Sequence, residues 1–270
     1  DLRMSEPALT SVIIPLYNGS ILIRRCLDSV FDQAGDVRTE VIVIDDGSTD
    51  NSEEIVRNYP KTIKLLKQGN QGPAVARNKG IEAATGKYLA FLDADDYWLP
   101  DFLKETVRFL EDNPEVIAIS TGQLHKIPGK PDTIAPAILK TDSEKYRQPV
   151  VLTDFFSFWA EHNHVCTGSV LMRTEIVKQT GGQRPELRVN EDIEFWAYLA
   201  TYGPWGFIPK VLFVSDGGVI VKSQGWKKYK NRLSKIPDFE QWFSRIDGKI
   251  DKMQHQALCP VFNRVIEGQS

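Results

Sequence analysis

The chain has 270 residues, of which 41% are hydrophobic and 26% charged, with a net charge of −3. The length fits one large domain or two small ones, and the charge balance excludes a globally basic nucleic-acid binder. No apolar run approaches the roughly 18 residues that a membrane span needs, and the first ten residues lack the apolar segment of a signal peptide. The three cysteines are far apart, which fits free thiols in a reducing compartment, so we expect a cytoplasmic protein.

The first 120 residues alternate between predicted strands and helices. Short β-branched or apolar runs bounded by turn residues predict strands, and apolar residues at a period of 3.6 predict the helices between them. Strands are predicted at 11–16, 40–44, 62–68, 87–92 and 116–120. Helices are predicted to begin near Ile23, after Asp50, at Pro73 and at Pro100. This alternation predicts an α/β fold with a parallel sheet and right-handed crossovers.

The second half of the chain is less regular. Residues 126–149 contain four prolines and few apolar side chains, which predicts a long excursion that packs loosely or covers a site. Strands are predicted at 168–173 and 206–215. Helices are predicted at 152–162, from Thr174 as a cap to Gly181, at 190–202 and beyond 238.

Polar side chains follow three of the first four predicted strands. The first strand runs into Tyr17 and Asn18, and the second into Asp45 and Asp46. The fourth runs into DADD (93–96). Because parallel strands end at one edge, where open α/β sheets bind ligands, we expect these groups to lie together. Five carboxylates repel unless a cation joins them, and Mg²⁺ or Mn²⁺ prefers oxygen ligands, so this edge predicts a metal with a phosphate ester.

Plainer explanations compete with each of these roles. Acids at strand ends also form turns and caps, which we favour for Asp50 but not for the acids of 93–96. Tyr17 can lie flat against a base, and Asp46 can accept the N3–H of a uracil, because an ionised carboxylate only accepts. Arg77 either faces the same edge from the third predicted helix or makes a surface salt bridge.

Six motifs in this order and spacing resemble the family 2 glycosyltransferases, which are inverting, nucleotide-sugar-dependent enzymes. They are SVIIPLYN (11–18), VIVIDDGSTDNS (41–52), GNQGPAVARNKGI (69–81), FLDADD (91–96), GSVLMR (168–173) and NEDIEFW (190–196). The resemblance implies the GT-A fold, a Rossmann-like, mostly parallel sheet with helices on both faces and here a helical and basic C-terminal extension. It divides the chain into a nucleotide-sugar-binding half at 1–120, an acceptor-binding and catalytic half at 121–215, and the extension at 216–270.

The resemblance also implies residue roles. Asp192, beside Glu191, is the expected general base, and the helix N-terminus favours its ionised form, although an acid there can be a simple cap. Asp93 and Asp95 resemble the DxD pair for ribose and for Mn²⁺ or Mg²⁺, with Asp96 as an alternative metal ligand. Contacts to the donor nucleotide are expected from Pro15, Tyr17, Asn18, Asp46, Gly72, Arg77, Asp93 and Ala94.

The expected reaction is the transfer of one sugar from a nucleotide-diphosphate sugar, most simply a UDP-sugar, to a hydroxyl of a glycan or lipid-linked acceptor in cell-surface polysaccharide synthesis. Acceptor contacts are expected from Glu191 and from stacking on Trp196, although such aromatics more often belong to the core. Processive synthases carry Q-x-x-R-W, whereas 241–245 has these letters in another order. The alternatives are an inactive sugar-binding protein on the same fold and a nucleotidyltransferase, whose Gly-rich, Lys-containing loop is missing after 11–16.

Two weaker patterns remain. His162, His164 and Cys166 form H-x-H-x-C, which lacks a clear fourth ligand for a soft metal and fits better as a loop near the acceptor. The stretch Lys222–Lys235 contains six basic residues interleaved with two aromatics. It is either a solvated face or a contact for the diphosphate, an anionic acceptor or the membrane, and the last would place the protein peripherally at the inner face of the membrane.

Overall fold

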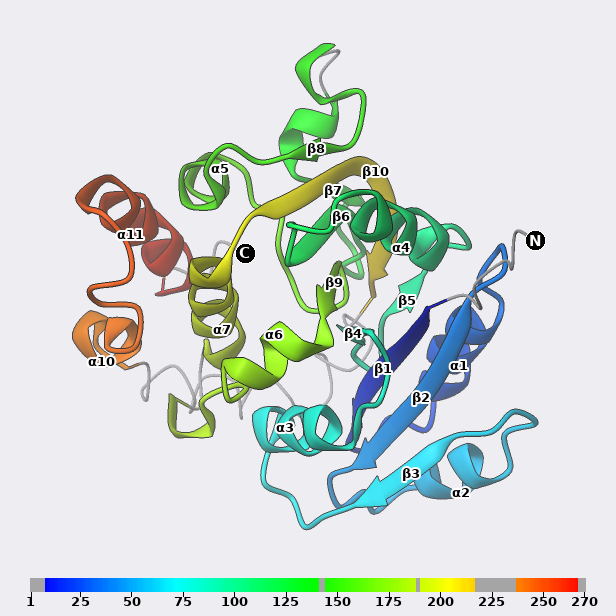
Figure 1. The fold of residues 1–270 in the computed structure, drawn as a ribbon. Helices are drawn as coiled ribbons and strands as arrows, with labels where there is room; N and C mark the ends of the chain where they lie inside the picture. The colour runs from blue at the N-terminus through cyan, green and yellow to red at the C-terminus, as the bar shows by residue number, and fades with distance from the viewer. Residues whose placement is uncertain (1–7, 141–143, 188–189, 217–236, 267–270) are drawn as a thin grey trace.

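A mixed ten-stranded sheet forms the centre of the molecule, with helices on both faces (Figure 1). The structure is a computed structural model that describes residues 8–140, 144–187, 190–216 and 237–266. The main strand order is β3-β2-β1-β4-β9-β6-β10-β5, with β7 paired to β6 and β8 to β10. In the described part of the chain, we find no helix that is both long and apolar enough to cross a bilayer.

The first half of the sheet is a parallel block. Its strands are β1 (Leu9–Leu16), β2 (Arg38–Asp45), β3 (Lys64–Lys67) and β4 (Tyr88–Phe91). The helices are α1 (Ile23–Phe31), α2 (Ser52–Arg57), α3 (Pro73–Ala83) and α4 (Phe102–Asp112), which follows the short β5 (Tyr97–Trp98). The first four predicted strands and the four predicted helices are therefore confirmed, and the fifth predicted strand, at 116–120, overlaps the start of the strand at 118–125. Their parallel pairing brings the carboxyl ends of β1, β2 and β4 to one edge.

The second half departs from the parallel arrangement. It contains β6 (Ala118–His125), β7 (Thr133–Ala135), β8 (Val150–Val151), β9 (Val170–Arg173) and β10 (Trp205–Ser215). Strand β9 runs antiparallel to both its neighbours, β4 and β6, whereas β6 and β10 are parallel. The expectation of a parallel sheet thus holds for β1 to β4 and for the pair of β6 and β10, whereas β5, β7, β8 and β9 all pair antiparallel with their neighbours.

Several helices and short turns complete the second half. The helices are α5 (Phe155–Glu161), α6 (Thr174–Gln179), α7 (Glu191–Leu199), α10 (Phe239–Phe243) and α11 (Lys252–Ile266). The 3-10 turns are Ala137–Lys140, Glu144–Tyr146, Pro185–Leu187 and Ala200–Tyr202. The predicted excursion at 126–149 therefore contains β7 and two of these turns. The predicted cap at Thr174 is wrong, because Arg173 holds the N-cap position and no side chain caps α6.

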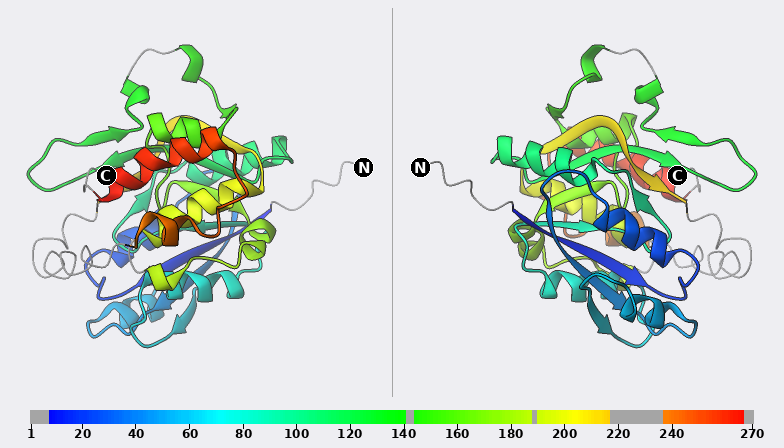
Figure 2. Two further views of the ribbon diagram at one scale, coloured as in Figure 1. Left: turned by 90° about the vertical axis from the view of Figure 1, so that its left-hand side faces the viewer. Right: turned by 90° about the vertical axis from the view of Figure 1, so that its right-hand side faces the viewer.

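Two apolar layers sandwich the sheet. Alternate residues of β1 point to opposite faces, so Ile13 joins one layer while Val12 and Ile14 join the other. The first layer includes residues of α3, α5, α7, α10 and α11, and the second includes residues of α1, α2 and α4. Figure 2 shows α7, α10 and α11 together on one side of the sheet and α1 on the other. The C-terminal helices therefore share a core with the helix that carries Asp192.

Candidate active site

The turns after β1 and β2 are tied together at the carboxyl edge of the sheet. Asn18 has a left-handed backbone (φ 51°), and its Oδ1 accepts a 2.8 Å hydrogen bond from the Thr49 N–H. The Asn18 N–H donates in turn to Ser48 Oγ at 3.0 Å. Pro15 pairs with Ile44 near the end of β1, and Tyr17 next to Asn18 is 41% exposed. This turn leaves the Tyr17 ring accessible at the carboxyl edge of β1, β2 and β4. We call this edge the donor edge, because the donor nucleotide is expected to bind there.

Asp46 fixes the loop that leads into α3. Its Oδ1 accepts hydrogen bonds of 2.8 Å from the Gln71 N–H and from Gln68 Nε2, and its Oδ2 accepts one of 2.8 Å from the Gly72 N–H. Gly72 has φ +93°, a conformation that suits glycine, and immediately precedes Pro73 at the start of α3. Asp46 is only 4% exposed, and its Oδ2 accepts one hydrogen bond although a carboxylate oxygen can accept two.

Arg77 and Asp93 join α3 to the end of β4. Arg77 is only 5% exposed, and its Nη2 donates to an Asp93 carboxylate oxygen at 2.7 Å. Its Nη1 donates to Gln183 Oε1 at 3.3 Å. Burial acts to lower the pKa of Arg77, but the charges of Asp93, Asp192 and Glu191 raise it above its usual value. The alternative of a surface salt bridge is therefore wrong, because this guanidinium is buried between acidic groups.

The DADD loop contains three carboxyl groups close together, and burial disfavours their ionised forms. Asp96 is 6% exposed, and its Oδ1 accepts a 2.8 Å hydrogen bond from the Asp216 N–H. Burial and the charges of Asp95 and Asp93 raise the pKa of Asp96 to about 8. Burial and Asp93 likewise raise the pKa of Asp95 to about 6. Arg25 from α1 contacts this loop through the Asp95 carbonyl at 2.6 Å and pairs with the Asp216 carboxylate.

The donor set at this loop fits a hard divalent cation. Arg77 occupies only Oδ1 of Asp93, and the Asp216 N–H occupies only Oδ1 of Asp96, so each of these acids keeps a second oxygen, and Asp95 is the third candidate ligand. A positive charge beside Asp95 and Asp96 would relieve the repulsion that raises both pKa values. Among the described residues, no three His, Cys, Asp or Glu side chains converge as a ready-made ligand set. The loop therefore suits an ion such as Mg²⁺, which takes one or two carboxylates and completes its shell with water and phosphate oxygens.

Asp192 lies in the first turn of α7, and the charge of Arg77 acts on its carboxylate. Asn190 (φ 63°) occupies the N-cap position of α7, and no side chain caps the helix. Burial and the neighbouring Glu191 raise the pKa of Asp192 to about 6, and Arg77 opposes this shift. The direction of this shift shows that burial and Glu191 outweigh the groups that favour the ionised form, among them Arg77 and the Ile193 backbone N–H. A carboxylate with a pKa of about 6 is ionised at neutral pH and basic enough to accept a proton.

The two expected acceptor residues have different surroundings. Trp196 is fully buried, with its ring centroid 6.1 Å from that of Phe91 and 6.5 Å from that of Trp205. The expectation that a sugar stacks on Trp196 is wrong, because core aromatics cover the ring. Glu191 is 9% exposed beside Asp192 and stays a candidate for an acceptor contact.

In the H-x-H-x-C pattern His164 belongs to the core, whereas His162 and Cys166 are half-buried, and none of them joins a metal-ligand cluster among the described residues. His164 is fully buried, its Nδ1 lies 2.7 Å from Ser120 Oγ, and it packs among aromatic rings that include Phe155 and Phe158. Burial lowers the pKa of His164 well below its usual value and raises that of Cys166. The imidazole is therefore neutral and the thiol protonated. The basic stretch Lys222–Lys235 lies outside the described residues.

Sequence reasoning missed several residues that surround the site. Gln183 contacts Arg77, Arg25 contacts the DADD loop, and Asp216 follows β10 onto the same loop. No local motif marks them, because each reaches the site from a segment distant in the sequence. The only available signal was the position of Asp216 directly after a predicted strand.

The comparison with protein families matches this architecture. The model for Glycosyl transferase family 2 matches residues 11–181, more than half of the chain. The chain therefore belongs to the family 2 glycosyltransferases.

Individual relatives cover different parts of the chain. The putative teichuronic acid biosynthesis glycosyltransferase TuaG of Bacillus subtilis is 30% identical over 199 residues, 72% of this chain and 73% of TuaG. The uncharacterized glycosyltransferase YibD of Escherichia coli is 50% identical over 118 residues, 42% of this chain and 34% of YibD. The matched segment thus spans about a third of YibD.

Solved structures show the same fold. Residues 1–349 of Staphylococcus aureus TarS in complex with UDP superpose with a TM-score of 0.62 at 18% identity, covering 96% of this chain and 90% of TarS 1–349. The mannosyltransferase PcManGT of Pyrobaculum calidifontis, in complex with GDP-Man and Mn²⁺, gives a TM-score of 0.61 at 23% identity, covering 97% and 70%. The predicted GT-A architecture is confirmed.

Proposed function

We propose that the chain is an inverting, non-processive glycosyltransferase. It moves one sugar from a nucleotide-diphosphate sugar, a UDP-sugar, to a hydroxyl of a glycan or lipid-linked glycan in cell-surface polysaccharide synthesis. The observation that carries the proposal is the placement of Arg77, whose guanidinium binds Asp93 of the donor edge and feels the charge of Asp192 on α7. The buried guanidinium of Arg77 therefore lies close to both the proposed base and the edge that is proposed to bind the diphosphate.

The relatives support the substrate class. TuaG is named for teichuronic acid biosynthesis, TarS is solved with UDP and with UDP-GlcNAc, and PcManGT with GDP-Man and Mn²⁺. A nucleoside diphosphate is common to these complexes, and two of them carry it as a nucleotide-diphosphate sugar. We assign the uridine donor to this chain because Asp46 keeps an acceptor position for a base N–H and Tyr17 is exposed beside it.

The residues then divide the reaction between them. Asp192 takes the proton of the acceptor hydroxyl while its oxygen forms a bond to C1 of the sugar and the bond from C1 to the diphosphate breaks on the opposite face. Tyr17 and Asp46 hold the base, and Asp93, oriented by Arg77, faces the ribose. Asp95 or Asp96 would hold Mn²⁺ or Mg²⁺, which when bound supplies charge neutralisation for the departing diphosphate.

The two alternatives are weaker. A nucleotidyltransferase disagrees with the family to which the chain belongs. An inactive sugar-binding protein has no need of an acid whose pKa is raised to about 6 next to a donor edge. A peripheral membrane contact through Lys222–Lys235 and a cytoplasmic location are further parts of the proposal, and binding of the chain to anionic vesicles would test the contact.

The test is sugar transfer with defined donors. The chain is incubated with Mn²⁺, a panel of UDP-sugars and GDP-Man, and aryl glycosides as hydroxyl acceptors, and both nucleotide release and glycoside product are measured. We expect product with at least one UDP-sugar and loss of product in Asp192→Asn. Tight UDP binding with neither product nor nucleotide release would support the inactive binding protein instead.

A further inference from the structure

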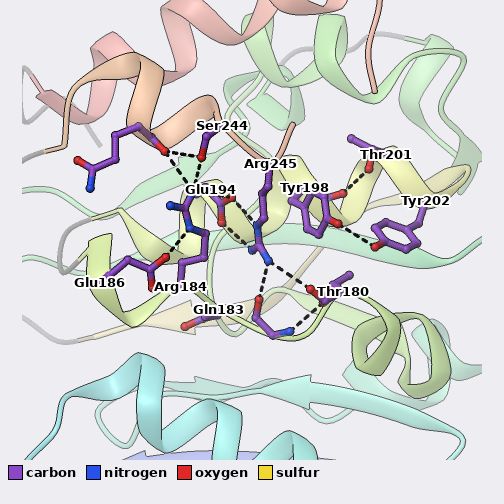
Figure 3. A network of polar contacts seen from close by, with 12 residues as sticks. Thr180, Gln183, Arg184, Glu186, Glu194, Tyr198, Thr201, Tyr202, Ser244 and Arg245 are labelled. Carbon is purple, nitrogen blue, oxygen red and sulfur yellow. Dashed lines mark hydrogen bonds and ion pairs between the residues drawn. The ribbon is translucent and has the colours of Figure 1, made fainter. Parts of the chain in front are cut away.

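A buried ion pair connects the C-terminal extension to the helix of the candidate base. Glu194 lies on α7 two residues after Asp192, and its side chain is completely buried. Arg245, from the segment between α10 and α11, donates through Nε and Nη2 to both Glu194 carboxylate oxygens, at 2.5 and 2.6 Å (Figure 3). Such bidentate pairs fix geometry as well as charge.

The same guanidinium also holds a neighbouring loop. Arg245 Nη1 donates to the Gly182 carbonyl at 3.0 Å and to the Thr180 carbonyl at 3.3 Å. Its guanidinium carbon lies 4.1 Å from the ring centroid of Tyr198, one turn after Glu194 on α7. Figure 3 shows Arg245 between Glu194 and Thr180. Arg245 therefore clamps α7 to the loop at 180–184.

That loop continues to the donor edge. The Gln183 N–H and carbonyl pair with the Asn78 side chain at 2.8 Å each, and Gln183 Oε1 accepts from Arg77. A Cβ on Gly182 would lie only 2.4 Å from Asn78 Oδ1, so the loop passes very close to α3. Arg77 then binds Asp93. An unbroken series of polar contacts thus runs from Arg245 to the DADD loop.

We propose that Arg245, together with Glu194, is a positioning pair that sets the first turn of α7, and with it Asp192, relative to the Arg77–Asp93 donor edge. This inference rests on the proposed function of Asp192 as the base. Arg245 touches no reacting atom, so it acts through α7 and the loop at 180–184. The C-terminal extension then contributes to the rate of transfer rather than only to stability.

A second arginine of the extension supplies the matched control. Arg264 on α11 donates to the Trp159 carbonyl at 2.6 Å and so anchors the same extension without touching α7. The variants Arg245→Met, Arg245→Lys and Arg264→Met are compared in the full chain. The measurements are kcat for sugar transfer at saturating UDP-sugar, UDP affinity by calorimetry, Tm, and amide exchange over α7.

The positioning role predicts a specific pattern. Arg245→Met lowers kcat about ten- to a hundredfold, the scale of a small misplacement of catalytic groups, and speeds exchange in the first turn of α7. UDP affinity stays within about twofold, since the nucleotide contacts lie on other residues. Arg245→Lys restores part of kcat, and Arg264→Met keeps kcat even where it lowers Tm.

Two outcomes separate failure of this inference from failure of the proposed function. Equal kcat values for Arg245→Met and Arg264→Met at matched folded fractions would overturn the positioning role and leave Arg245 as an anchor. Full transfer by Asp192→Asn would instead overturn the proposed base, and with it the claim that Arg245 acts through Asp192. If Arg245→Met proves too unstable to assay, Glu194→Gln provides the same test, because it keeps the shape of the side chain and removes the charge.

Discussion

The backbone N–H of Gly72 lies 2.8 Å from Oδ2 of Asp46, so the end of β2 holds the N-terminus of α3 directly. Asp46 is thus both a predicted contact for the nucleotide base and a fastening for the loop that precedes Arg77. A substitution at Asp46 will be felt at both places.

We predict that Asp46→Ala weakens UDP binding. Losing a hydrogen bond to a charged group costs about 1.5–3 kcal/mol, which is roughly a 10- to 150-fold rise in Kd. Calorimetry with UDP and Mn²⁺ measures it. Glu53→Ala, an acid on α2 that pairs with Lys67, is the control and should leave Kd unchanged. An unaltered Kd for Asp46→Ala would place the base contact elsewhere. Tighter binding of GDP than of UDP by the native chain would indicate a guanosine donor.

UDP binding should depend on a divalent ion held by the DADD loop. Removing the metal with EDTA takes away an attraction to the diphosphate, and each loss of about 1.4 kcal/mol raises Kd tenfold. Calorimetric titrations with Mn²⁺, with Mg²⁺ and with EDTA decide the matter. Equal affinity in EDTA would contradict the metal role.

Asp95 rather than Asp96 should be the carboxylate through which the ion acts. Asp96 is more deeply buried and is occupied by the Asp216 N–H. We therefore expect Asp95→Asn to abolish the Mn²⁺ dependence of UDP binding and Asp96→Asn to reduce stability while keeping that dependence. The opposite pattern would transfer the ligand role to Asp96.

Asp192→Asn should abolish transfer and leave donor binding nearly intact. An amide has almost the same shape but cannot accept the proton, and general-base catalysis is worth about 10²–10⁴ in rate. Slow hydrolysis of the donor by water is expected to survive. Transfer kinetics and UDP-sugar calorimetry on one preparation test this. Near-normal turnover would show that Asp192 is structural and would make Glu191 the next candidate, to be tested by Glu191→Gln.

The pH dependence of kcat/KM should report the raised pKa of Asp192. The base acts only when ionised, so with a pKa of about 6 the rate should rise between about pH 5 and pH 7 and level off above. An ordinary aspartate would give a flat profile over that interval. Because the pKa of Asp95 is also about 6, UDP affinity is measured over the same interval. If the rise in kcat/KM between about pH 5 and pH 7 only follows the rise in UDP affinity, the titrating group is Asp95 instead of Asp192.

The gathering of polar residues at the carboxyl edge of the sheet could be predicted from sequence because its signals are local. Asp46 and Asp93 each follow directly on a buried apolar strand, so the chain position of the acid also gives its position in the sheet. The position of Arg77 on its predicted helix indicates that it lies near the edge. Its burial depends on Asp93 and Gln183, which come from two other segments of the chain.

Other features could not be predicted because they depend on distant partners. Three of the four residues of β9 are apolar, as in a buried parallel strand, and only the neighbouring strands determine its direction. Trp196 has the same spacing on its helix whether it faces a sugar or the core. The pair of Glu194 and Arg245 joins residues 51 positions apart, and neither belongs to a motif that marks the other.

The antiparallel placement of β9 has a consequence for the order of events during synthesis. Its two neighbours, β4 and β6, are complete by residue 125, but the strand that joins them ends only at residue 173. The growing chain therefore carries β4 with an uncovered edge until β9 emerges, and β6 lacks both β9 and β10, because β10 follows still later in the chain. Exposed edges invite pairing with other chains. A nascent or truncated chain that stops before β9 should consequently be the form of this protein most prone to aggregate, and the period between β6 and β9 the one in which a ribosome-bound chaperone has most to protect.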